Sequence, residues 1–83
     1  MGIVEEIRQL IQKGKIEAGL EKLNQWAEQN DNDIYNTSIL LLSRHNQLKR
    51  NVNMGVISQG DADRSHNRIV LSILSTLDEI SES

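Results

Sequence analysis

The sequence predicts an all-α protein, and three features of the 83-residue chain indicate this class. It contains no proline, the residue that most strongly disrupts helix interiors. It is rich in Leu, Ile, Glu, Gln and Lys, a composition that favours helices. Apolar residues recur every three or four positions in four segments that are separated by short polar or glycine-containing breaks. The simplest architecture is an antiparallel four-helix bundle, formed by one domain over residues 1–83, in which a short helical hairpin packs against a long one.

The first two helices are expected over residues 2–13 and 16–29. Gly14 is placed to end the first helix in the left-handed conformation, and the short connection predicts a hairpin. Gly19 lies inside the second helix, where it predicts close approach of a neighbouring helix. Trp26 lies beside the apolar seam, so it is either partly buried or an interface anchor. The seam of the second helix consists of Ile16, Leu20, Leu23 and Ala27.

The third helix is the longest continuous segment of the chain and is expected over residues 32–55. Asp31, Asn32 or Asp33 can cap its start, and Gly55 is the candidate for its end. Ile39 widens its apolar stripe, whereas Leu40 points away from it and must meet either another helix or a partner. The stripe itself follows steps of four and three through Ile34, Ser38, Leu41, His45, Leu48 and Val52.

The fourth helix is expected over residues 59–82. Ser58 with Asp61 three residues later resembles a capping box, and Ile57 precedes it as a hydrophobic staple. Leu71 and Leu74 flank the apolar stripe of this helix. The stripe consists of Ala62, His66, Ile69, Ile73, Thr76 or Leu77, and Ile80.

The residues that carry chemistry are few, and their spacing does not suggest an active site. Without cysteine there is no disulfide and no thiolate ligand. His45 and His66 lie on stripes of adjacent helices and can approach each other, but no carboxylate stands at metal-ligand spacing from either. No glycine-rich phosphate loop is present. We therefore expect no enzyme activity, no cofactor and no metal. The absence of a signal peptide and of a long apolar run predicts a cytoplasmic protein without a membrane partner.

Charge is unevenly distributed along this chain of net charge −3. Residues 1–33 are mainly acidic, whereas residues 34–60 contain basic side chains and no acidic one. These charges are either scattered, solvated side chains or two complementary faces suited to self-association. A nucleic-acid partner is not expected, because positive charge and stacking aromatic residues are both scarce. The candidate interface residues are Arg44, Lys49, Arg50, Arg64, Arg68, Trp26, Tyr35, Glu17 and Glu21.

A pattern of residues spread over nearly the whole chain resembles one known family, the eleventh type of the effector-associated domains. Leu10 to Leu23, LIQKGKIEAGLEKL, is similar to the opening hairpin of that family. The remainder of the pattern consists of Asp33, Tyr35-Asn36, Ile39, Leu41, Ser43, Asn46, Leu48-Lys49-Arg50, Gly55, Ile57-Ser58, Asn67-Arg68-Ile69 and Leu74. This family is related to the bacterial death-like domains, although the classical death fold has six helices and four are predicted here.

The resemblance implies a death-like adaptor of bacterial conflict and anti-phage immune systems. It would recruit effectors by association with like domains, either as a homo-oligomer or filament or with a matching domain. The residues that match the family pattern, taken as structural or interface positions, are Tyr35, Asn36, Lys49, Arg50, Asn67 and Arg68. We expect a polar link between Tyr35 or Asn36 and Asn67 or Arg68. The alternative is a small helical regulatory or scaffold domain that binds an unrelated protein.

Overall fold

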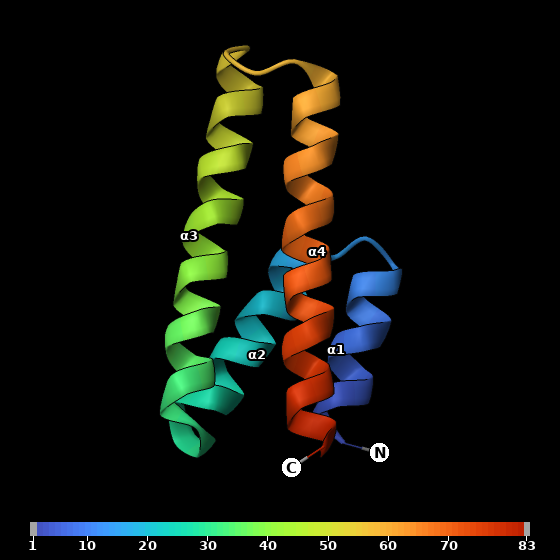
Figure 1. Ribbon diagram of the computed structural model, residues 1–83, viewed down its shortest axis with the longest axis vertical. Coiled ribbons are helices and arrows are strands. Elements are labelled where there is room, and N and C mark those ends of the chain that lie inside the picture. The colour runs from blue at the N-terminus through green and yellow to red at the C-terminus, as the bar shows by residue number, and fades with distance from the viewer. Residues whose placement is uncertain (1, 83) are drawn as a thin grey trace.

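The computed structural model describes residues 2–82, which form four α-helices and no strand (Figure 1). The helices are α1 (Ile3–Gln12), α2 (Ile16–Asn30), α3 (Asn32–Met54) and α4 (Gln59–Glu82). The prediction of an all-helical protein with four helices is confirmed. Each predicted helix range agrees with the structure to within one residue at either end.

Local sequence signals set most of these helix ends. The Asp31 carboxylate accepts hydrogen bonds from the backbone N–H groups of Asp33 (3.0 Å) and Ile34 (3.1 Å), so Asp31 caps α3. Gly14 and Gly55 adopt φ angles of 78° and 70°, the left-handed conformation predicted for both. The Ser58 hydroxyl accepts from the Asp61 N–H at 3.2 Å, as expected for a capped start of α4. The polar break predicted between the second and third helices is shorter than expected, because only Asp31 lies outside both of them.

The two long helices form the frame of the molecule. Figure 1 shows α3 and α4 side by side and running in opposite directions, while α1 and α2 lie against one end of them. In the same view α2 is inclined to α3 and α4, so the four helices are not all aligned. Contacts link α1 to α2, α2 to α3, α3 to α4, and α4 back to α1. The result is an elongated molecule of 39 × 22 × 17 Å.

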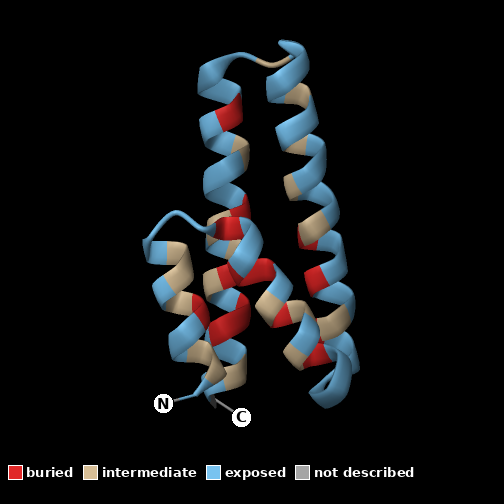
Figure 2. Ribbon diagram, turned by 180° about the vertical axis from the view of Figure 1, so that it is seen from behind, coloured by how far each residue is buried: buried red, intermediate tan, exposed pale blue. Residues whose placement is uncertain are grey.

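The hydrophobic core lies where all four helices meet, which is the lower half of Figure 2. The predicted seam of α2 is buried in full, and Ile7 joins it from α1. Ile73 and Leu77 of α4 are completely buried there as well. A Cβ atom built on Gly19 would lie 2.8 Å from Cδ1 of Ile11, which confirms the predicted close approach of a neighbouring helix. The core thus joins the short helices to one half of the long ones.

Beyond this core, α3 and α4 continue as a two-helix projection, called here the arm and defined as residues 44–68. Only Ala62 is buried within it. Val52 is 44% exposed and His66 is also exposed, although both were predicted on core stripes. Leu48 is half-buried between the two helices. The two predictions were wrong because the apolar stripes extend past the ends of α1 and α2, where no further helix covers them.

Three other apolar side chains are more exposed than most of their neighbours. Ile39, which was expected to widen the core stripe of α3, is 45% exposed. Leu40 points away from the core, as predicted, and is half exposed. Leu71, expected beside the core stripe of α4, is 65% exposed. Each therefore remains available for contact with another molecule.

Candidate functional site

The arm contains all five basic side chains that were predicted to form an interface. Arg44, Lys49 and Arg50 lie on α3, and Arg64 and Arg68 lie on α4. The only acidic residues of the arm are Asp61 and Asp63. The chain therefore concentrates positive charge on the part of the molecule that has the least core.

Most of these cations are not neutralised within the chain. Arg64 lies 3.6 Å from the carboxylate of Asp61 one turn earlier on α4, and both side chains are largely exposed. Among the residues described, Arg44, Arg50 and Arg68 form no ion pair. An exposed arginine without an ion-pair partner can donate hydrogen bonds to a carboxylate of another molecule with little rearrangement.

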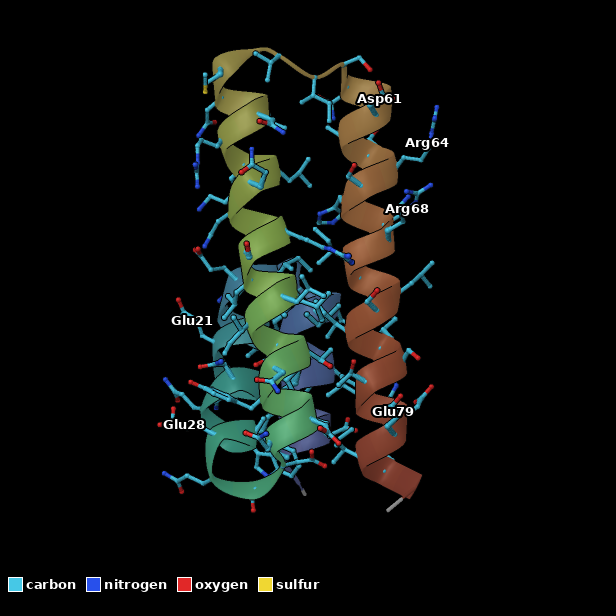
Figure 3. The ribbon with its side chains drawn as sticks, turned by 60° about the vertical axis from the view of Figure 1, so that its left-hand side comes forward. Glu21, Glu28, Asp61, Arg64, Arg68 and Glu79 are labelled. Carbon is cyan, nitrogen blue, oxygen red and sulfur yellow. The ribbon has the colours of Figure 1, made fainter. Side chains whose placement is uncertain are left out.

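One predicted interface pair is already joined inside the molecule. Lys49 lies 3.6 Å from Glu17 at the start of α2, and each side chain is about half exposed. The attraction between the acidic hairpin and the basic third helix therefore operates, for this pair, between α2 and α3 of a single chain. Glu21, one turn further along α2, has no such partner among residues 2–82 and points outward (Figure 3).

The two aromatic candidates lie at the opposite end of the molecule from the arm. Trp26 and Tyr35 flank the corner at Asp31 and pack against the hydrophobic core, each half-buried. Partial burial, the first of the two alternatives for Trp26, is confirmed. The structure does not bring the aromatic and basic candidates together.

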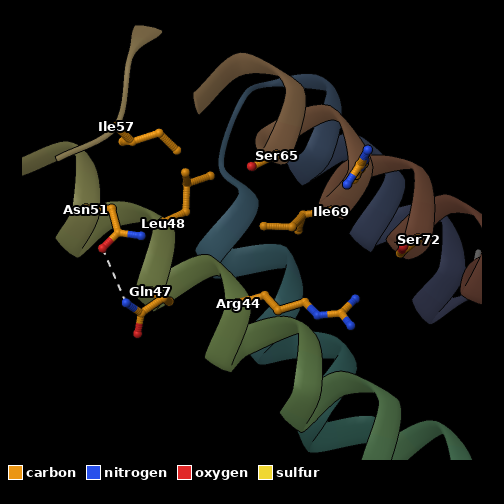
Figure 4. Close-up of a pocket in the computed structure, with 9 residues that line it drawn as sticks. Arg44, Gln47, Leu48, Asn51, Ile57, Ser65, Ile69 and Ser72 are labelled. Atoms are coloured by element: carbon orange, nitrogen blue, oxygen red, sulfur yellow. Dashed lines mark hydrogen bonds between the residues drawn. The ribbon is translucent and has the colours of Figure 1, made fainter. Parts of the chain in front are cut away.

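Two grooves run along the seam of the arm, one on each side. The arginine groove, about 350 Å³, is lined by Arg44, Gln47, Leu48, Asn51, Ile57, Ser65, Arg68, Ile69 and Ser72. Figure 4 shows Leu48 and Ile69 facing each other across its floor, while Arg44 extends from α3 towards α4. No acidic residue lines this groove. Its chemistry suits a ligand that combines a carboxylate with an apolar group.

The histidine groove, about 370 Å³, is lined by His45, Leu48, Lys49, Val52, Asn53, Gln59, Ala62, Asp63 and His66. The two histidines thus share one groove, as their positions on adjacent helices predicted. Burial lowers the pKa of His45, and the nearby positive charges of Lys49 and His66 lower it further, while Glu17 opposes them. The Nδ1 atom of His45 is buried and has no hydrogen-bond partner in the described part of the chain. Within residues 2–82, no group of three or more His, Cys, Asp or Glu residues is arranged to hold a metal ion.

The polar link expected between Tyr35 or Asn36 and Asn67 or Arg68 does not form. Asn36 is exposed, and it precedes Leu48, the α3 residue that faces Ile69 (Figure 4), by about 18 Å along the helix axis at a rise of 1.5 Å per residue, so it lies far from the level of Asn67. A different polar link is present. Asn24 of α2 donates to the hydroxyl of Ser38 (3.0 Å), which donates to the backbone carbonyl of Tyr35 (2.7 Å).

Sequence reasoning missed Asn24, although a signal for the link existed. Ser38 occupies a position on the apolar stripe of α3 and is completely buried. A hydroxyl in such a position needs a hydrogen-bond partner. The identity of that partner depended on how α2 packs against α3, which the sequence pattern did not specify.

No helix in the part of the chain that the structure describes has the length and apolar character needed to cross a membrane.

Comparison with known proteins places the chain in a family. Neither the curated proteins nor the solved structures contain a match to this sequence. The sequence pattern of effector-associated domain 11, in contrast, matches residues 2–81, which is nearly the entire chain. The protein therefore belongs to the effector-associated domain 11 family.

Proposed function

We propose that this chain is a cytoplasmic, non-enzymatic adaptor of bacterial conflict and anti-phage signalling that recruits an effector by binding a like domain. The partner is a second copy of the chain or a matching effector-associated domain. The family match supports an adaptor or regulatory role. Recruitment by such a domain needs an exposed docking surface and no reaction site.

The observation that carries this proposal is the uncompensated positive charge of the arm. Arg44 and Arg50 are exposed side chains of α3, and neither has an acidic partner within residues 2–81. The outer face of α2 carries the complementary charge, because Glu21 and Glu28 both point outward there (Figure 3). One copy can therefore dock its arm against α2 of the next. A contact between two different surfaces repeats from one copy to the next, so it builds an open assembly unless the rotation between successive copies closes a ring.

This contact predicts that Arg50→Glu weakens self-association. The substitution would place a carboxylate opposite Glu21 or Glu28 of the neighbouring copy, so attraction becomes repulsion. We expect sedimentation velocity to show smaller species for the variant than for the wild type at equal concentration. Raising the salt concentration should reduce the wild-type assembly in the same way, because exposed charges are screened.

Lys15→Glu is the matched control for this experiment. Lys15 is exposed, lies outside the arm and undergoes the same change of charge. Assembly should persist in this control. Assembly of Arg50→Glu that equals the wild type, together with salt-independent assembly of both, would contradict docking through the arm.

The arginine groove favours a second candidate function, a regulatory or scaffold domain for an unrelated protein. Its two arginines and its floor of Leu48, Ile57 and Ile69 fit an acidic segment with an apolar side chain. A nucleic acid fits it less well, since residues 44–68 contain no Phe, Trp or Tyr for stacking on bases. A chain that stays monomeric but binds an acidic amphipathic peptide would favour this second function over the first.

A further inference from the structure

The outward face of α4 carries a stripe of charge that changes sign halfway along the helix. The α4 stripe consists of Arg64, Arg68, Leu71, Ser75 and Glu79. Its steps of four, three, four and four residues keep all five side chains within one face of an α-helix. Its first two members are basic and its last is acidic.

This stripe lies opposite the side of α4 that faces the core. Ile69, Ile73 and Leu77 are buried, whereas all five residues of the α4 stripe are exposed. Figure 3 shows Arg64, Arg68 and Glu79 along one side of α4, pointing away from α3. Leu71, near the middle, is 65% exposed. A large apolar side chain therefore lies in solvent between the two charged halves.

The charges of the stripe cannot neutralise each other within one helix. Arg68 and Glu79 are separated by eleven residues, or about 16 Å along the axis at 1.5 Å per residue. Neither of them forms an ion pair with any other residue that the structure describes. No residue that the structure describes supplies their complement, so both charges are open to contact by another molecule.

We propose that two copies of this chain pair through the α4 stripe, with their α4 helices antiparallel around a two-fold axis. In this arrangement Arg68 of each copy faces Glu79 of the other, and the axis passes between Ser72 and Ser75. Leu71 of each copy lies over Ser75 of the other, so both exposed leucines are covered. The inference rests on the proposed function and adds a contact between identical surfaces to the contact between the arm and α2.

A second copy is the occupant because the stripe is complementary to itself only in the antiparallel orientation. Parallel pairing would place Arg68 against Arg68 and Glu79 against Glu79, and like charges in register are unfavourable. Antiparallel pairing replaces both repulsions with attractions. A two-fold axis makes each contact occur twice, which doubles the effect of one favourable residue pair.

The contact should be weak and sensitive to salt. Each half contributes one large apolar side chain, and its ion pairs remain near solvent, where they contribute little. Such an interface falls at the small end of specific protein contacts. Clustering of the domain would therefore raise the population of pairs, as signalling by recruitment requires.

Charge exchange tests this pairing directly. Arg68→Glu and Glu79→Arg should each weaken self-association at least about tenfold, because each turns two attractions into two repulsions. An equimolar mixture of the two variants should associate again. In a mixed pair the two substituted side chains face each other with opposite charges, and so do the two native ones. The double variant Arg68→Glu with Glu79→Arg should self-associate like the wild type. Sedimentation equilibrium measures all four samples, with Lys15→Glu as the control for charge.

The outcomes separate this inference from the proposed function. Single variants that associate as strongly as the wild type would overturn the α4 pairing and leave like-with-like recruitment intact. Single variants that weaken self-association without recovery in the mixture would also overturn the α4 pairing, because the weakening would then come from another surface. Arg68, unlike Glu79, also lines the arginine groove. A wild-type chain that is monomeric at every concentration would overturn the α4 pairing and self-association, and would leave a matching effector-associated domain as the partner in the proposed function. Circular dichroism of each variant shows whether the helices remain folded.

Discussion

At the scale of single residues, polar side chains on apolar stripes show what a sequence pattern can predict. The stripe of α3 placed Ser38 and His45 correctly on the side that faces other helices. It did not predict that Asn24 would satisfy Ser38, or that Nδ1 of His45 would be left without a partner among the described residues. Those outcomes depend on residues of other helices, and periodicity along one helix carries no information about them.

The environment of His45 predicts that acid destabilises the fold. Its pKa is lowered in the folded chain by burial first, with Lys49 and His66 adding to the effect and Glu17 opposing it. The unfolded chain therefore binds a proton more readily than the folded one. The contribution of His45 to the stability of the fold is fully present above the pKa of the unfolded state, about 6.5, and declines as the pH falls below that value.

His45→Gln tests this dependence. Thermal unfolding followed by circular dichroism between about pH 7.5 and 5 should show a smaller drop in Tm for the variant than for the wild type, because only the wild type gains a proton at this position on unfolding. Asp63 lines the same groove and is present in both proteins, so its contribution cancels in the comparison. Equal drops in the two proteins would mean that other groups dominate the response to acid.

At the scale of helices, the ends were more predictable than the packing. Asp31, Gly14 and Gly55 act on their own turns, and a local sequence is sufficient to identify such signals. Cover is different. At 1.5 Å per residue, α3 and α4 are each about 35 Å long, whereas α1 and α2 are about 15 and 22 Å. The short helices therefore cannot cover the full stripes, and the arm remains as two helices.

This mismatch predicts that the arm is the least stable part of the fold. Because residues 44–68 bury little apolar surface, local opening there should require less free energy than opening near Ile73. In native-state hydrogen exchange, amides of the arm should exchange at least about tenfold faster than amides of α4 around Ile73. Uniform protection along α3 and α4 would contradict a weakly supported arm.

At the scale of the whole molecule, the fold divides into a four-helix base and a two-helix arm. The base contains the core and the half-buried Trp26 and Tyr35. The arm contains the basic residues that the sequence identified as an interface. Of the candidate acidic partners, Glu17 is used inside the chain and Glu21 remains exposed.

The α4 stripe was not predicted as a unit, although Arg64 and Arg68 were among the candidate residues. Leu71 was expected beside the core, and Glu79 was not among the candidate interface residues. The meaning of the stripe depends on which side of α4 faces α3 and α1. That orientation requires the packed structure, after which the sign change along the outward face is visible.

The central claim is that this domain associates with copies of itself, and its most direct test is the molar mass of the wild-type chain against concentration. Light scattering at low and high salt, with negative-stain images of the same samples, provides that measurement. We predict a mass that rises with concentration at low salt and falls towards the monomer when salt is added. A monomeric mass at every concentration and salt level would contradict the claim.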